Sequence, residues 1–123
     1  MIVRNIYISI DATNRVWISG KKTYIDPVLP GQVMKGFSIG EVVFSKSQKY
    51  KIGDLVMGVL GWEKYSMVQD KGLGHVPKDY PHPHHFLGVF GISGLTAWVG
   101  LFEIGKIKAN DIVIVSAAAG AVG

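Results

Sequence analysis

The sequence of 123 residues contains no cysteine. This absence excludes disulfide bonds and thiolate metal sites, and it leaves no indication of an oxidising compartment. Long apolar runs are lacking too. No uncharged window approaches the length of a membrane span, and Arg4 and Asn5 interrupt the first apolar residues, where a secretory leader needs a continuous core. We therefore expect a cytoplasmic protein that makes no membrane contact.

Dense clusters of a single charge are also lacking. The net charge is +4, but the thirteen lysine and arginine residues are spread along the chain. The densest group, Lys46, Lys49 and Lys51, has one aromatic neighbour, Tyr50, and is interpreted as a solvated loop rather than a nucleic-acid surface. Hydrophobic residues make up 48% of the chain and charged residues 18%, which is typical of a globular protein rather than a disordered one.

The first ten residues carry the pattern of a strand. Residues 2–10 alternate between two faces, and one face is apolar apart from Arg4. A half-buried strand is therefore predicted, with this face toward the core; its apolar members are Ile2, Ile6, Ile8 and Ile10. The polar residues 11–15 that follow favour local hydrogen bonds to the backbone, so a turn or a short helical bend is predicted there.

Short strands continue along the next fifty residues. They are expected over residues 36–44, 55–60 and 62–68, and Gly53-Asp54 between the first two is a hairpin signal. Short strands at close intervals, separated by glycine and charged turns, indicate a barrel or a curled sheet. The fold class is therefore expected to be mainly β.

After a loop over residues 72–86, the hydrophobic period changes from two to 3.6. A helix is predicted from residue 93 to Gly105, with Ser93 or Gly94 as its cap. Its apolar stripe consists of Leu95, Trp98, Val99 and Phe102. The change of period predicts a domain boundary near residues 86–93, and the two domains are expected over residues 1–92 and 93–123.

The last stretch of the chain carries the clearest candidate binding motif. Residues 112–116 predict a fully buried strand, and a run of small residues follows it. Gly120 and Gly123 match the second and third glycines of the dinucleotide pattern G-x-G-x-x-G, with Ala118 at the first position. Small residues let the backbone approach a pyrophosphate, but they also occur wherever a helix packs closely on a strand. On the motif alone, the two interpretations are about equally favoured.

Seven stretches, in order, carry a resemblance to a known family over nearly the whole chain. They are Asn5-Ile-Tyr-Ile-Ser-Ile-Asp11 with Arg15, Gly31-Gln-Val-Met-Lys-Gly36, Gly40-Glu-Val-Val, Gly53-Asp-Leu-Val-Met-Gly58, Gly61-Trp-Glu-Lys-Tyr65, Gly91-Ile-Ser-Gly-Leu-Thr-Ala-Trp98 and Ser116-Ala-Ala-Ala-Gly-Ala-Val-Gly123. The sequence resembles the amino-terminal part of a medium-chain dehydrogenase/reductase of the quinone oxidoreductase superfamily. Within that group it is most similar to zinc-independent, NADP-dependent double-bond reductases: prostaglandin/leukotriene reductases, plant alkenal reductases and bacterial curcumin reductase-like proteins.

The resemblance implies a fold and a domain order. Residues 1–92 would form a GroES-like barrel, and residues 93–123 a linking helix and the first strand of a Rossmann domain truncated at Gly123. Because most of the cofactor site would then lie outside the chain, we expect these 123 residues alone to be catalytically inactive. The intact parent is expected to be a homodimer.

The resemblance also implies site residues. NADP(H) is the expected cofactor, with its pyrophosphate near residues 119–123 and its nicotinamide near Ile92 and Thr96; the small-residue positions are Ala119, Gly120, Ala121, Val122 and Gly123. Thr13 and Asn14 would line the substrate cleft, although Thr13 stands where similar proteins commonly have an aromatic residue. For Thr96 an alternative role is a hydrogen bond to its own i−4 carbonyl. Trp62 and Tyr65 could form an apolar wall, with core packing as the favoured alternative.

No metal is expected. The stretch where zinc-dependent relatives have Gly-His-Glu carries no histidine, and the chain has no cysteine. His75, His82, His84 and His85 are interpreted mainly as loop residues, because prolines hold the segment extended and no carboxylate lies close in sequence. A histidine-loop metal binder is the weakest of the functional alternatives.

The expected function of the parent is hydride transfer from NADPH to the β-carbon of an enone or quinone substrate. Charge then builds on the carbonyl oxygen, and a donor stabilises the enolate before protonation at the α-carbon. No catalytic residue is assigned within these 123 residues. The alternative is a barrel that serves as a non-catalytic binding or assembly module.

Overall fold

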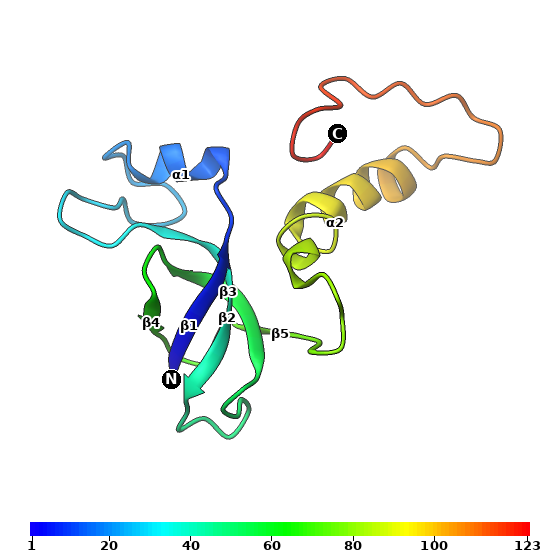
Figure 1. Cartoon of the computed structure of the whole chain (residues 1–123). Helices are drawn as coiled ribbons and strands as arrows, with labels where there is room; N and C mark the ends of the chain where they lie inside the picture. The colour runs from blue at the N-terminus through cyan, green and yellow to red at the C-terminus, as the bar shows by residue number, and fades with distance from the viewer. The chain divides into compact units, whose positions relative to one another are not determined.

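The computed structural model describes residues 1–123, which fall into two compact units, Met1–Pro83 and His84–Gly123. The first unit is built on a sheet and the second on a helical segment (Figure 1). The division lies between Pro83 and His84, whereas the sequence pattern indicated a boundary near residues 86–93 and domains over residues 1–92 and 93–123.

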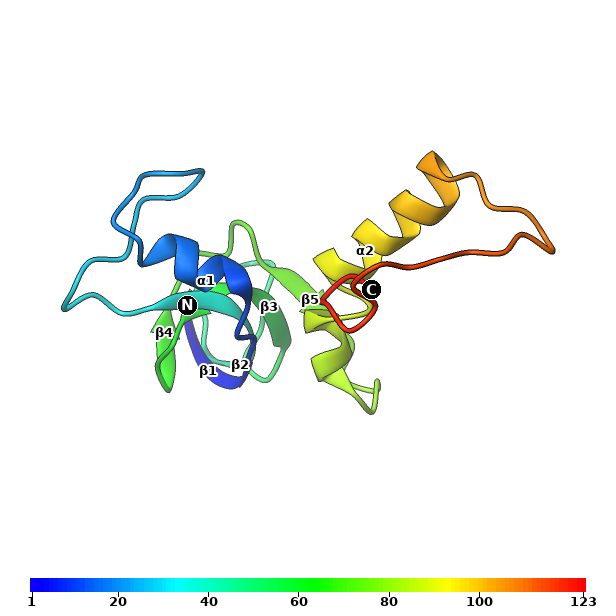
Figure 2. The ribbon, with the colours of Figure 1, turned by 90° about the horizontal axis from the view of Figure 1, so that it is seen from above.

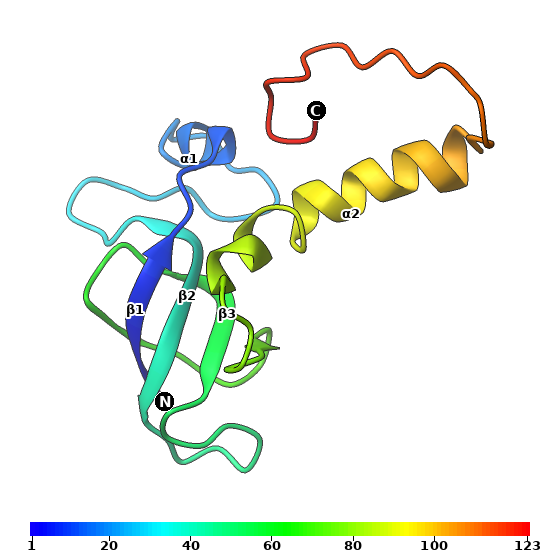
Figure 3. The ribbon, with the colours of Figure 1, turned by 45° about the vertical axis from the view of Figure 1, so that its right-hand side comes forward.

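The first unit contains one antiparallel sheet of five strands in the order β4-β1-β2-β3-β5. The three longest strands, β1, β2 and β3, lie side by side at its centre (Figure 3). The strand bounds are Ile2–Ile8 for β1, Lys35–Phe44 for β2, Leu55–Gly61 for β3, Tyr65–Met67 for β4 and Gly74–Val76 for β5. The mainly β fold class predicted for this part of the chain is therefore confirmed.

The hairpin between β2 and β3 forms where the Gly53-Asp54 signal predicts it. The two strands pair without interruption from Lys35 opposite Gly61 to Glu41 opposite Leu55. Gly53 has a φ of +86°, a conformation that costs glycine little and other residues more. Its N–H donates to the carbonyl oxygen of Val42 (2.7 Å), which closes the turn.

The core of the first unit lies on one face of the curled sheet. Its buried members are Val3, Val42, Tyr50, Val56, Leu60 and Leu73. The Tyr50 hydroxyl donates to the carbonyl oxygen of Leu73, so this phenol is hydrogen-bonded as well as buried. The residues of the loop between β2 and β3 thus help to close the core.

The predicted inward face of β1 is wrong. Val3, from the opposite face, is fully buried, while Ile2, Ile6 and Ile8 are 36–47% exposed. The core forms on the Val3 side because Val42 of β2 and Val56 of β3 point there too. Alternation shows that a strand has two faces, but the neighbouring strands decide which face the core covers.

Two shorter strand predictions also need correction. The strand expected over residues 62–68 is limited to the three residues of β4. Residues 72–86, expected to be a loop, contain β5 and a 3₁₀ turn, η1, over Pro83–Leu87. β5 is three residues long and includes Gly74, so it lacks the β-branched run that marks a strand in the sequence.

The second unit confirms the predicted helix. α2 spans Ile92–Trp98 and continues as a wider π-helical turn, η2, over Val99–Ile104. Gly91 is the N-cap, two residues before the expected start, and Gly105 follows the last turn as predicted. No helix of the structure is both long enough and apolar enough to span a membrane.

The buried strand predicted over residues 112–116 is not formed. These residues adopt no strand pairing, and the side chains of Ile112 and Ile114 are 94% and 92% exposed. A strand is stabilised by hydrogen bonds to a neighbouring strand, and the second unit contains none. The apolar run therefore has neither a pairing partner nor a layer to cover it.

Candidate functional site

A short helix, α1 (Ala12–Trp17), lies over the end of the sheet where β1 finishes and β2 begins (Figures 1 and 2). It corresponds to the helical bend predicted for residues 11–15. Asp11 is its N-cap and has extended backbone geometry. The helix carries both residues that the sequence assigns to the substrate, Thr13 and Asn14.

Asn14 holds α1 in place. Asn14 is only 7% exposed, and both the nitrogen and the oxygen of its side-chain amide form hydrogen bonds. Nδ2 donates to the carbonyl oxygen of Lys35 on β2 (3.0 Å), and Oδ1 accepts the backbone N–H of Asp11 (2.6 Å). The amide thus joins the cap of α1 to the first residue of β2, which is a positioning role.

Thr13 lies on the same face of α1 as Trp17, because the two residues are four apart. Both side chains bond the hydroxyl of Tyr24, which belongs to the loop after the helix. Thr13 Oγ1 and the Tyr24 hydroxyl oxygen are 2.5 Å apart, and Trp17 Nε1 donates to the same hydroxyl at 3.0 Å. This is the local environment of the predicted substrate residue, and Tyr24 is a member that the sequence reasoning did not identify.

The tryptophan beneath this cluster is anchored to the sheet. Trp17 is 2% exposed, and its ring centroid lies 6.5 Å from that of Phe37 on β2. The ring of Tyr24 meets Trp17 edge to face, also at 6.5 Å between centroids. Edge-to-face pairs are a favourable aromatic arrangement. The position of Tyr24 is therefore defined by one ring contact and two hydrogen bonds.

Trp62, named as a candidate wall residue, lies in the turn between β3 and β4. Its Nε1 comes so close to β2 that a Cβ added to Gly36 would lie 2.3 Å from it. Its backbone N–H donates to the carbonyl oxygen of Met34 (2.6 Å). Trp62 and Tyr65 are 37% and 49% exposed, so neither ring is a fully buried core residue.

Asn5 fixes this turn and was not identified as functional from the sequence. Its Nδ2 donates to the carbonyl oxygens of Gly61 and Glu63, both at 2.8 Å, and contacts Ser66 Oγ at 3.0 Å. Because the two carbonyls can only accept, the amide must present nitrogen to them. Its Oδ1 is consequently buried without a hydrogen-bond partner. The sequence feature that could have indicated this role is a single amide residue within a strand of mostly apolar residues.

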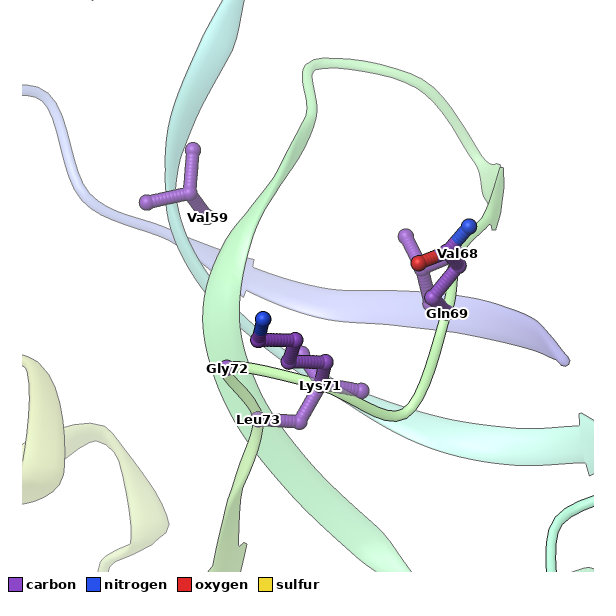
Figure 4. A pocket seen from close by; sticks show the side chains of 6 residues that line it. All are labelled: Val59, Val68, Gln69, Lys71, Gly72 and Leu73. Carbon is purple, nitrogen blue, oxygen red and sulfur yellow. The ribbon is translucent and has the colours of Figure 1, made fainter.

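A cavity of about 360 Å³ opens elsewhere on the first unit (Figure 4). It is lined by Val59, Val68, Gln69, Lys71, Gly72 and Leu73. A smaller hollow of about 220 Å³ shares Val59 and Val68 with it. None of the residues predicted from the sequence to form a site lines either hollow.

In the second unit, the cofactor candidates at the helix are placed as follows. Ile92 begins α2 and is 63% exposed. The hydroxyl of Thr96 donates to the carbonyl oxygen of Ile92 at 2.7 Å. This is the i−4 bond given above as the alternative role for Thr96, so its proton is already used within the helix.

The small-residue run forms a tight, exposed turn. The N–H of Gly120 donates to the carbonyl oxygen of Ala117 (2.7 Å), and Ala117 itself has a φ of +51°. A Cβ on Gly123 would lie 2.4 Å from the same carbonyl oxygen and 2.6 Å from Cα of Ala118. The turn thus folds back on itself as only glycine allows. Residues 117–123 are all exposed.

The four histidines do not form one cluster. No group of three or more histidine, cysteine, aspartate or glutamate side chains is arranged to hold a metal ion. His84 and His85 form an edge-to-face pair with centroids 4.7 Å apart, and His75 lies against the ring of Tyr50 at 4.5 Å. The two predicted groups of site residues also belong to separate units, α1 to the first and residues 92–123 to the second.

Comparison with known proteins adds family information. Residues 1–76 match the family described as the N-terminal domain of oxidoreductase. The chain is 37% identical over its full length to the putative NADP-dependent oxidoreductase YfmJ of Bacillus subtilis and 36% identical to the NADPH-dependent curcumin reductase of Escherichia coli. It is 34% identical to a 2-alkenal reductase (NADP(+)-dependent) of Nicotiana tabacum. In each case the whole chain aligns with 36% of the relative.

A solved structure is similar as well. The structure of CurA from Vibrio vulnificus in complex with NADPH superimposes on the chain with a TM-score of 0.84 at 36% identity. The match covers 100% of the chain and 36% of CurA. The chain therefore spans about a third of the length of the relatives and the structure that it resembles.

Proposed function

Because the chain belongs to the family of N-terminal oxidoreductase domains, we propose that it contributes to an NADPH-dependent reductase of carbon–carbon double bonds in enones or quinones. The observation that carries this proposal is the alignment of the whole chain with 36% of CurA, a protein whose structure holds NADPH. The relatives named as curcumin reductase and 2-alkenal reductase support the same reaction class.

In this proposal, the sheet of Met1–Pro83 is the core of a GroES-like barrel domain over residues 1–92. Residues 93–123 form the linking helix and the opening of a Rossmann domain. The exposure of Ile112 and Ile114 supports this assignment, because a β-branched run with no cover is the surface that neighbouring strands would bury. We expect residues 112–116 to become a strand only when the remaining Rossmann strands are present.

NADP(H) is the proposed cofactor, and when bound it supplies the hydride. The turn at residues 119–123 would hold the pyrophosphate through backbone N–H groups other than that of Gly120, which is bonded to the carbonyl oxygen of Ala117. Ile92 offers an exposed apolar side chain. Thr96 offers the unused lone pairs of a hydroxyl whose proton is bonded within α2.

The substrate side is assigned to α1. Thr13 would contact the substrate, while Asn14 keeps the helix on the sheet and so sets the position of Thr13. Holding a flat substrate in one orientation and excluding water are the contributions expected of this unit. No residue of the chain is assigned to proton transfer.

The proposal is tested by NADPH oxidation with a panel of enones and quinones. Two proteins are compared: the 123-residue chain, and a chimaera in which the chain replaces the aligned third of the E. coli curcumin reductase. We expect no turnover by the chain alone and enone-dependent oxidation by the chimaera. Turnover by the chain alone would contradict the proposed division of the cofactor site.

A second arm distinguishes reductase from binding module. NADPH binding by the chimaera is measured through the quenching of protein fluorescence. A Gly120→Val variant is the control, because it places a side chain against the pyrophosphate turn. A folded chimaera that binds NADPH but reduces none of the substrates would refute the reductase assignment. We also propose that the intact parent is a homodimer, and light scattering of the chimaera tests this.

A further inference from the structure

The cluster of Thr13, Trp17 and Tyr24 has one hydrogen-bond donor more than it uses. An indole N–H only donates, so Trp17 must give its hydrogen to the Tyr24 hydroxyl oxygen. The contact between Tyr24 and Thr13 consumes one of their two hydroxyl hydrogens. Neither hydroxyl bonds any other protein group, so one O–H hydrogen is left over.

The leftover hydrogen is carried by one of two neighbouring hydroxyls. If Tyr24 donates to Thr13, the free hydrogen is on Thr13; if Thr13 donates to Tyr24, it is on Tyr24. The two oxygens are 2.5 Å apart, so in both cases the free O–H belongs to this one pair of neighbouring hydroxyls. In both cases the buried indole N–H of Trp17 donates to the hydroxyl oxygen of Tyr24.

An exposed aromatic surface adjoins the donor. Tyr24 is 74% exposed, although its hydroxyl is bonded twice and its ring packs on Trp17. An exposed tyrosine usually samples several rotamers, and its immobilisation costs entropy on ligand binding. Here the protein's own contacts already define the rotamer, so the ring is preorganised for contact with a ligand.

We infer that Thr13 and Tyr24 together form a binding site for a flat, conjugated carbonyl compound. The ring of Tyr24 contacts the planar part of the ligand, and the leftover O–H of the pair donates to the carbonyl oxygen. The inference rests on the proposed function for the identity of the ligand as a substrate. This site is expected to bind aryl-conjugated enones more tightly than aliphatic enones, because their larger flat surface covers more of the Tyr24 ring.

The experiment measures binding to the 123-residue chain in the absence of NADPH. Two probes are titrated by NMR: trans-4-phenyl-3-buten-2-one and the hydrocarbon of the same shape with C=CH₂ in place of C=O. The indole N–H signal of Trp17 reports on the cluster. We expect the ketone to bind about three- to tenfold more tightly than the hydrocarbon, the effect of one neutral hydrogen bond.

The variants give a pattern that a merely structural role does not produce. Thr13→Val leaves the Tyr24 hydrogen free, and Tyr24→Phe leaves the Thr13 hydrogen free, so each single variant keeps the preference for the ketone. The double variant has no hydroxyl, and the buried indole cannot reach the ligand, so the preference disappears. Tyr24→Leu weakens both probes equally because it removes only the flat surface and one of two hydroxyls.

Each result of these titrations either supports or overturns the inference. A ketone preference that persists in the folded double variant, or that is already lost in Thr13→Val, overturns it. Titrations in which neither probe moves the Trp17 signal also overturn it. Failure of the reductase proposal would instead appear as a chimaera that binds NADPH but reduces no enone, whatever the titration shows.

Discussion

Replacing Asn14 by alanine separates a scaffolding role from a substrate-binding role for this residue. The substitution removes two hydrogen bonds, one to the Lys35 carbonyl oxygen at 3.0 Å and one from the Asp11 N–H at 2.6 Å. Because Asn14 is 7% exposed, water cannot fully replace the lost side chain. Both backbone groups are then left short of a partner.

The magnitude follows from these contacts. Each hydrogen bond is worth about 1 kcal/mol net, and the orphaned groups raise the cost toward about 3 kcal/mol in total. Alanine returns about 0.5 kcal/mol through its higher helix propensity. The expected loss in the free energy of unfolding is thus about 2.5 kcal/mol. At about 4 °C per kcal/mol for a domain of this size, Tm falls by about 10 °C.

The assay is thermal unfolding followed by circular dichroism, with Arg15→Ala as the matched control. Arg15 is the next residue of α1, is exposed, and makes no ion pair in the structure. It should change stability by no more than about 0.5 kcal/mol. If the Asn14 and Arg15 variants unfold at the same temperature, the scaffolding argument is refuted.

Three further predictions concern other parts of the chain. Gly36→Ala places a Cβ 2.3 Å from Trp62 Nε1, so the indole is displaced; we expect a loss of about 1–3 kcal/mol and altered tryptophan emission. The backbone N–H of Lys51 holds the pKa of Asp54 below its ordinary value, so this carboxylate stabilises the fold above about pH 4 and the contribution is lost as pH falls. The Tm difference between wild type and Asp54→Asn should therefore shrink on acidification below pH 4. Gly94→Ala brings a Cβ within 1.7 Å of a preceding carbonyl oxygen, so the signals of α2 should be lost from the NMR spectrum while those of the sheet remain.

Local signals in the sequence predicted the elements that depend on local chemistry. The β2–β3 hairpin follows from Gly53-Asp54, and the helix over residues 92–104 follows from its 3.6-residue period and Gly105. The burial of β1 was wrong because both faces contain apolar residues, and only the positions of β2 and β3 select one of them. The strand at 112–116 was wrong because pairing needs a neighbour.

The candidate site was predictable only in part. Thr13 and Asn14 were singled out together, yet the structure gives them different partners: a loop hydroxyl for one and the backbone of β2 for the other. Tyr24 was missed because its contact with Thr13 spans eleven positions and leads from α1 into an irregular loop, for which no periodicity exists. The i, i+4 spacing of Thr13 and Trp17 was the available signal, since it places two polar atoms on one helix face.

The central claim is that this chain serves hydride transfer to a conjugated carbon–carbon double bond. The most direct measurement is the fate of deuterium when the chimaera with the E. coli curcumin reductase is supplied with NADPH deuterated at C4 and trans-4-phenyl-3-buten-2-one. We predict a saturated ketone with deuterium at the β-carbon, read by NMR and mass spectrometry. A folded, NADPH-binding chimaera that yields no deuterated product, or one labelled at the carbinol carbon, would contradict the claim.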